Sequence, residues 1–324
     1  IAILWGFNGY FQSMLWSPGM ALLANWWPGH RRGFATGLAN GFSGLGQVCA
    51  ALAVSLSIII LPGFGWKAGF IIPAAIMILT GIIYLFFIKD SPKKIGLKDY
   101  VDPDAVKMEK DEELRELVSQ KGKLYPYIHL FKQWRFDCWL LIIASSSIAR
   151  YGLLTWIPTY YVQNFGVDIK EGALGTILLP LGMAFGTFII PTISDKYFSE
   201  NRLPMVIICA AAAGLTVFIF RGIDPGPIAG MLLFSAGFFI YGINGIVWAY
   251  AIDVGGRVFA GTAAGILDCF AYLGAAVQAI IFGSVLTSTG NWTLVFTAIV
   301  GVCAGMILLS IIAGWGLNKK KDIV

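Results

Sequence analysis

The chain has 324 residues, of which 57% are hydrophobic and only 13% are charged, and its mean hydropathy is +0.76. A soluble domain carries about a quarter of its residues as charged ones, so this chain lacks the polar surface of a soluble enzyme, a disordered protein or a nucleic-acid-binding protein. The net charge of +5 comes mainly from basic connectors and therefore indicates no nucleic-acid partner. We expect an all-α fold, a polytopic bundle of helices whose surroundings are the lipid bilayer.

Apolar stretches follow one another along the whole chain, and each is long enough to cross about 30 Å of hydrocarbon as a helix. We expect nine of them, at 1–27, 34–61, 67–88, 136–162, 173–193, 204–221, 227–251, 259–287 and 292–316. The third and fourth stretches are separated by a highly charged segment, 89–135, in which residues 102–123 are predicted to form a surface helix or a flexible connector.

Basic residues gather in alternate connectors, above all in 89–135 and in the tail 319–324. Lys and Arg concentrate in the cytoplasmic loops of membrane proteins. The C-terminus is therefore expected in the cytoplasm, with the protein in the cytoplasmic membrane.

An internal repeat relates the beginning of the chain to its end. Three glycines in or directly before the second stretch recur with the same spacing in the eighth: Gly33, Gly37 and Gly46 correspond to Gly261, Gly265 and Gly274. The later copy is preceded by three stretches, 136–221, that have no counterpart before residue 1. We therefore expect a six-plus-six architecture that lacks about its first three helices here.

This division gives four parts of the chain. Residues 1–88 are the remainder of the N-terminal half, helices 4 to 6, and 89–135 form a cytoplasmic connector. Residues 136–318 are the C-terminal half, helices 7 to 12, and 319–324 form a basic cytoplasmic tail.

Four groups of residues, in chain order, resemble the organophosphate:phosphate antiporter family of the major facilitator superfamily, in particular its glycerol-3-phosphate and hexose-6-phosphate exchangers. They are Phe11-Gln12 with Trp16-Ser17-Pro18, Trp26-Trp27 and Arg32-Gly33; Arg150-Tyr151-Gly152 with Trp156 and Pro158-Thr159-Tyr160; Ser194-Asp195-Lys196 with Asn201-Arg202; and residues 260–265 with Tyr272-Leu273-Gly274.

The resemblance implies a monomeric carrier that exchanges a phosphorylated organic anion for inorganic phosphate by alternating access. The cargo leaves chemically unchanged, so we expect no enzyme and no cofactor, and the sequence contains no metal-ligand motif. Two alternatives stay open: a cation-coupled organic-anion symporter, and a transporter-like sensor of hexose phosphate.

Arg150 lies deep in the fourth stretch, where an arginine is expensive unless it faces a wet cavity or a partner. Its guanidinium offers a bidentate fork to phosphate oxygens and stays charged at physiological pH. The alternative is a salt bridge within the bundle. The resemblance also implies a phosphate-binding arginine at this position, whereas the second arginine of that family, on its first helix, is not found in this chain.

Further candidates surround this expected site. Asp268 is a second charge within an apolar stretch, and three roles remain open for it: counter-ion to Arg150, proton-coupling carboxylate, or packing residue near a loop. The corresponding position of the antiporters is commonly not acidic. Five other residues map to the lining of the family's cavity and are expected to shape the pocket: Tyr241, Tyr272, Asn40, Ser43 and Trp16.

Asp195 and Arg202 bracket a short connector on the cytoplasmic side. An aspartate and an arginine in this position can form a conformational latch between helix ends in one access state. The alternative is a solvated run of charges.

Overall fold

The computed structural model describes residues 2–27, 31–97, 105–166, 177–198 and 200–315. Within these ranges the chain is helical throughout its ordered elements and contains no strand, so the predicted all-α class is confirmed. The helices are α1 (Ala2–Trp26), α2 (Arg32–Ile60), α3 (Ala68–Phe87), α4 (Ala105–Lys121), α5 (Tyr125–Phe131), α6 (Trp134–Phe165), α8 (Leu178–Tyr197), α9 (Leu203–Phe220), α10 (Pro227–Thr289) and α11 (Trp292–Gly314), with short 3-10 turns η2 (Pro62–Lys67) and η3 (Pro92–Ile95).

Seven described segments are long and apolar enough to cross a membrane. They are α3, α6, α8, α9, α11 and both parts of α10, Pro227–Gly256 and Val258–Thr289. The expected stretches at 227–251 and 259–287 thus form one helical run that is interrupted at Gly256, where φ is 55° and ψ is −150°. Only glycine adopts such a conformation readily, and it turns the second span back beside the first.

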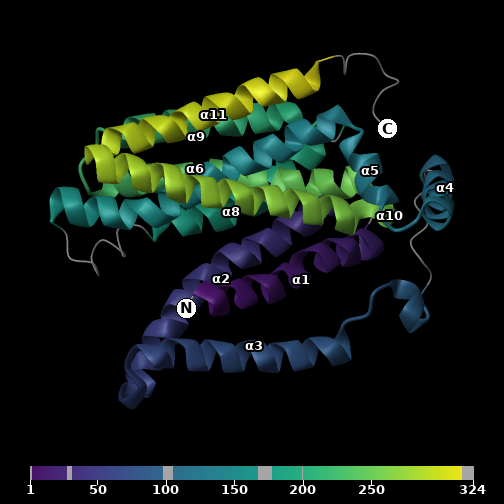
Figure 1. Cartoon of the computed structure of the whole chain (residues 1–324), viewed down its shortest axis with the longest axis horizontal. Coiled ribbons are helices and arrows are strands. Elements are labelled where there is room, and N and C mark those ends of the chain that lie inside the picture. The colour runs from purple at the N-terminus through teal and green to yellow at the C-terminus, as the bar shows by residue number, and fades with distance from the viewer. Residues whose placement is uncertain (1, 28–30, 98–104, 167–176, 199, 316–324) are drawn as a thin grey trace.

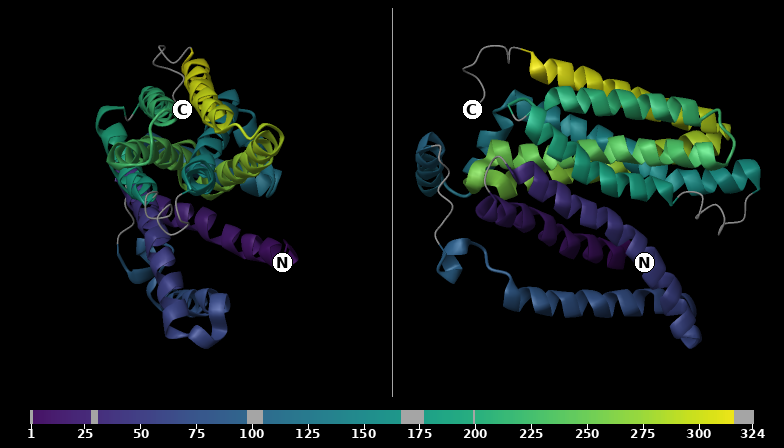
Figure 2. Two further views of the ribbon diagram at one scale, coloured as in Figure 1. Left: turned by 90° about the vertical axis from the view of Figure 1, so that its left-hand side faces the viewer. Right: turned by 180° about the vertical axis from the view of Figure 1, so that it is seen from behind.

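The elements after residue 133 form one bundle, and α1 and α2 lie against one side of it (Figure 1). Within the bundle, α10 contacts α6, α8 and α9, and α11 contacts α6 and α9. The helices α1 and α2 meet the bundle near the interruption of α10 and diverge from it toward their other ends, as both views of Figure 2 also show. The third helix of this part, α3, contacts α2 and η2 and otherwise stands apart.

Glycines set the close contact between α8 and α10. A Cβ atom on Gly182 or Gly186 would collide with the backbone carbonyl of Phe234 or Phe238. The four-residue spacing of the two glycines places them on one face of α8, the small-residue pattern by which membrane helices approach closely. The close packing of α8 against α10 therefore requires glycine, which has no Cβ atom, at positions 182 and 186.

The connector from α3 to α6 starts beside the end of α1. The indole of Trp26 donates to the carbonyl of Lys89 at 2.9 Å, and the Asn25 amide donates to the carbonyl of Asp90 at 3.2 Å. The predicted helix within residues 102–123 is present as α4, and its described side chains from Glu112 onward are mostly exposed.

Candidate functional site

Arg150 occupies the middle of α6 and packs between aromatic rings. Its guanidinium carbon lies 4.5 Å from the centre of the Tyr151 ring and 4.2 Å from the centre of the Tyr241 ring, which comes from the first span of α10. These distances are typical of cation–π contacts. They hold the guanidinium between α6 and α10 without using its hydrogen-bond donors.

Those donors have no protein partner in the described part of the chain. Among the residues that the structure describes, the buried Nε atom of Arg150 has no hydrogen-bond partner and no carboxylate lies within ion-pair distance of the guanidinium. The predicted alternative, a salt bridge that consumes Arg150 within the bundle, is therefore not formed here. A partly buried arginine with free donors is a site that an anion can complete.

Asp268 and Tyr272 lie on the second span of α10. That span packs against α6, where a Cβ atom on Gly274 would lie 2.2 Å from the carbonyl oxygen of Ala144. Tyr272 is 56% exposed, and Asp268 is partly exposed and makes no hydrogen bond or ion pair within the described residues. Arg150 therefore lies beside Tyr241, and Asp268 and Tyr272 lie on the neighbouring span of α10.

Trp16 lies just past the middle of α1 and contacts the first span of α10. Its ring centre is 5.1 Å from that of Trp248 in an edge-to-face contact, and its buried indole Nε1 has no hydrogen-bond acceptor among the described residues. One turn before Trp248, the side chain of Asn244 is 4% exposed and its Oδ1 atom is also without a donor. Asn244 and Trp248 share a helix face with Tyr241, and neither is among the site residues predicted from the sequence.

Asn40 and Ser43 are not joined to this cluster. Asn40 is 2% exposed, and its amide donates to the carbonyl of Thr36 in the same helix at 2.8 Å. The nearby Gly37 faces the carbonyl of Thr187 on α8, so this part of α2 is packed against α8. Ser43 is exposed on α2. Their role in lining a pocket stays a prediction.

A cavity of about 700 Å³ opens between α1, α5 and the second span of α10. Its walls are mostly apolar and extend from Tyr127 and Phe131 at the connector to Cys269, the residue after Asp268. The close contact of Gly265 with Ser17 forms part of the same wall: a Cβ atom on Gly265 would lie 3.0 Å from the Ser17 hydroxyl. No group of three or more metal-ligating side chains occurs among the described residues.

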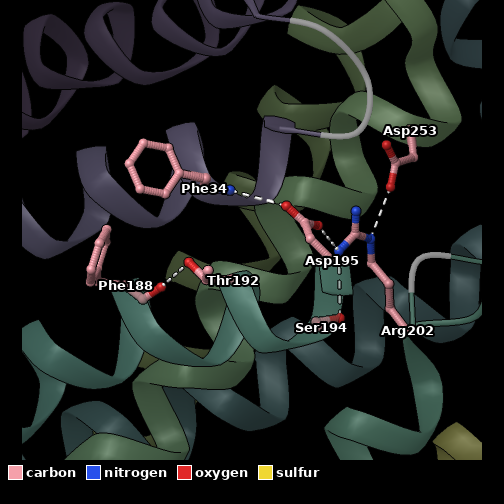
Figure 3. Close-up of polar contacts among 7 residues, drawn as sticks. All are labelled: Phe34, Phe188, Thr192, Ser194, Asp195, Arg202 and Asp253. Atoms are coloured by element: carbon pink, nitrogen blue, oxygen red, sulfur yellow. Dashed lines mark hydrogen bonds and ion pairs between the residues drawn. The ribbon is translucent and has the colours of Figure 1, made fainter. Parts of the chain in front are cut away.

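Asp195 and Arg202 form the expected ion pair, in a network larger than predicted (Figure 3). Arg202 donates to Asp195 at 2.7 Å and to Asp253, at the end of the first span of α10, at 2.9 Å. Burial alone would lower the pKa of the Arg202 guanidinium, but the carboxylates of Asp253 and Asp195 outweigh this effect and raise the pKa above its ordinary value. Arg202 is only 6% exposed, so the alternative of a solvated charge run does not apply to it.

The same network reaches α2. The backbone N–H of Phe34 donates to the second carboxylate oxygen of Asp195 at 3.1 Å. Phe34 is the third residue of α2, so its N–H is one of those that a helix leaves without a partner at its start, and the preceding Arg31 offers no side-chain cap. Asp195 therefore caps α2 from another helix, beside a cavity of about 400 Å³ that Trp27, Arg31 and Lys196 also line.

Comparison with known proteins agrees with this architecture. The family model of the Major Facilitator Superfamily matches residues 1–279. The chain is 26% identical to the glycerol-3-phosphate transporter of Bacillus subtilis, over 98% of this chain and 71% of that protein. It is 28% identical to a probable hexose phosphate transport protein of Chlamydia pneumoniae, over 99% of this chain and 72% of that protein.

A third relative is the membrane sensor protein UhpC of Escherichia coli, which is 28% identical over 95% of this chain and 69% of that protein. These relatives confirm the resemblance to the organophosphate:phosphate antiporters, and this chain spans 69–72% of the length of each of them. With seven segments able to span the bilayer, the chain is an integral membrane protein that belongs to the major facilitator superfamily.

Proposed function

We propose that the protein carries a phosphorylated organic anion, such as glycerol 3-phosphate or a sugar phosphate, in exchange for inorganic phosphate. The observation that carries this proposal is Arg150, a charge in the middle of a membrane helix whose donors have no protein partner. Phosphate oxygens match the guanidinium fork and neutralise its charge. The names of the relatives, which include transporters of glycerol 3-phosphate and hexose phosphate, favour the same cargo.

In this proposal, transport proceeds by alternating access. The group α1–α3 rocks against the bundle of α6, α8, α9, α10 and α11, and the site between them opens to one side of the membrane at a time. Asp195 and Arg202 act as a latch that holds the start of α2 on α8 while the opposite ends of these helices are apart. The carrier is a monomer in the cytoplasmic membrane with its C-terminus in the cytoplasm, because the basic connector and tail favour that side.

The test is phosphate counterflow in proteoliposomes with Arg150→Lys. Lysine keeps the positive charge but loses the planar fork, and a hydrogen bond to a charged group contributes about 1.5–3 kcal/mol. We expect uptake of glycerol 3-phosphate or glucose 6-phosphate to fall at least about tenfold. Arg221→Lys is the matched control, since Arg221 ends α9 and donates to Thr297 at 3.2 Å, away from this site. Unchanged exchange in the Arg150 variant would remove this residue from the binding site.

A sensor of hexose phosphate is the second candidate, and the similarity to UhpC favours it. A sensor would bind the phosphate ester at Arg150 without exchanging it, so vesicles loaded with inorganic phosphate separate binding from transport. A cation-coupled symporter would use Asp268 as its coupling carboxylate. Exchange that does not respond to an imposed pH or sodium gradient would exclude that third possibility.

A further inference from the structure

The cavity between the start of α2 and the end of α8 carries positive charge that no protein group neutralises. Its volume is about 400 Å³, and its lining includes Arg31, directly before α2, and Lys196, near the end of α8. Both side chains are exposed, and neither forms an ion pair with another described residue. Because small-molecule sites have volumes of about 300–1,000 Å³, this cavity has the size and the free charge to hold an anionic group.

The carboxylate in the cavity wall, that of Asp195, is already compensated. One of its oxygens accepts from Arg202 at 2.7 Å, and the other accepts from the backbone N–H of Phe34 at 3.1 Å (Figure 3). Arg31 and Lys196 therefore remain as an excess of positive charge around the cavity. A cation would find no free carboxylate among these described lining residues, so the cavity favours an anion.

The place of the cavity along α8 corresponds to the surface of a bilayer. Lys196 is the next-to-last residue of Leu178–Tyr197, a segment able to span the membrane, and the indole of Trp27 forms part of the cavity wall. Tryptophan is enriched at the boundary between headgroups and hydrocarbon. Basic pockets between membrane helices at this level are sites that bind anionic lipid headgroups.

Exposed apolar side chains continue from the cavity along both helices. On α2, Leu38 and Phe42 follow the lining residue Phe34 by four and eight residues and are 37% and 65% exposed. On α8, Phe185 precedes the lining residue Thr192 by seven residues and is 51% exposed. Residues with these spacings share a helix face, so an acyl chain can lie along them while its headgroup occupies the cavity. A free phosphate ion would make no use of this surface.

We propose that this cavity binds the headgroup of an anionic phospholipid, with the phosphodiester between Arg31 and Lys196 and the acyl chains along α2 and α8. Arginine and lysine both form charge-assisted hydrogen bonds to phosphate oxygens. Because the two residues come from different helices, one bound lipid also holds the start of α2 and the end of α8 together. This inference goes beyond the proposed function and depends neither on Arg150 nor on the cargo.

Native mass spectrometry of the purified chain in detergent tests the proposal. It measures the dissociation constant of the first bound lipid for phosphatidylglycerol and for phosphatidylcholine with the same acyl chains. We expect phosphatidylglycerol to bind at least about tenfold more tightly, because each basic residue near a membrane surface favours anionic lipid. Arg31→Gln combined with Lys196→Gln should remove most of this preference, whereas Arg31→Lys combined with Lys196→Arg, which keeps both charges, should retain most of it.

Lys67→Gln combined with Arg221→Gln is the matched control. It removes the same two charges beyond the opposite ends of α2 and α9, and it should leave the preference intact. Equal affinity of the two lipids for the wild-type chain would overturn the proposal, as would an equal loss of preference in the two charge-removing double variants. Displacement of phosphatidylglycerol by glycerophosphoglycerol, the same headgroup without acyl chains, would also overturn it, because a soluble anion would then suffice.

Discussion

The contact between Asp195 and the start of α2 joins two groups of helices that separate in the proposed transport cycle. Asp195→Ala removes the carboxylate that accepts from Phe34 at 3.1 Å and from Arg202 at 2.7 Å. The ion pair lies within the bundle, where Asp253 still compensates Arg202 at 2.9 Å. The contribution that bears on opening is therefore the hydrogen bond from Phe34.

The size of that contribution follows from the charge of the acceptor and its position at a helix N-terminus. A hydrogen bond to a charged acceptor contributes about 1.5–3 kcal/mol, and a carboxylate at a helix N-terminus gains about 0.3–1 kcal/mol from the helix dipole. The Asp195 side chain is 11% exposed, so competing hydrogen bonds from water reduce this contribution. We estimate about 2 kcal/mol, which corresponds to a shift of roughly 30-fold toward the separated arrangement of α2 and α8.

Double electron–electron resonance between spin labels on the adjacent ends of α2 and α8 measures this shift. Asp253→Asn is the matched control, because it weakens the same Arg202 network without touching Phe34. We expect Asp195→Ala to populate a longer distance that the wild type scarcely samples and Asp253→Asn to leave the distribution nearly unchanged. Equal shifts in the two variants would refute the reasoning, since the network itself and not the cap on α2 would then hold the ends together.

Three further predictions concern packing, the site and the connector. Gly186→Ala should lower the unfolding temperature in detergent, with a cost of about 1–3 kcal/mol, because the added methyl meets a backbone carbonyl of α10; Gly305→Ala, which meets nothing within 4 Å, should not. Tyr241→Leu should weaken phosphate binding about tenfold in calorimetry, whereas Tyr241→Phe, which keeps the ring under the guanidinium at 4.2 Å, should retain more of the affinity. The hydrogen bond and charge of Lys94 lower the pKa of the Asp90 carboxyl below its ordinary value of 3.8. The Asp90–Lys94 ion pair is therefore fully formed above pH 3.8 and is lost as the pH falls through the lowered pKa. Lys94→Gln should raise the pKa of Asp90 back toward 3.8 in a carbon-13 NMR titration.

The helices could be predicted from the sequence because hydrocarbon imposes a length on each apolar run. The expected stretch 204–221 and the helix Leu203–Phe220 differ by one residue at each end. The apolar stretches do not predict how the two spans of α10 are linked. Gly255 and Gly256 separate them, and one glycine with positive φ turns the chain without ending the helical pattern on either side.

Charged candidate residues are easier to pick out from the sequence than neutral ones, because a charge stands out within an apolar stretch. Arg150 and Asp268 are conspicuous because such residues are costly in a membrane. Asn40 is predicted to line a pocket. In the structure its amide donates to the carbonyl of Thr36 in the same helix at 2.8 Å, and the sequence pattern does not indicate this hydrogen bond. Asn244 could have been found from its spacing to Tyr241, since residues three apart share a helix face.

The latch shows a second limit. Asp195 and Arg202 were paired because they are close in the sequence, whereas Asp253 lies 51 residues after Arg202 and Phe34 contributes only its backbone. No side-chain pattern marks a free N–H at a helix start. Its partner depends on which carboxylate the packing of α2 and α8 brings near.

The exposure of α3 has a physical meaning that differs from that of a soluble protein. Its apolar side chains, among them Leu85, Phe86 and Phe87, are more than two-thirds exposed. In a bilayer those surfaces meet lipid, which is as apolar as they are, so burial against other helices provides little driving force. Cohesion must come from close backbone contacts and polar links. The bundle has the tightest of the former between α8 and α10. The helix α2 also approaches α8 closely at Gly37, where a Cβ atom would lie 2.8 Å from the carbonyl oxygen of Thr187. Contacts between helices in lipid can be broken and remade without unfolding either group, which is what the proposed rocking motion requires.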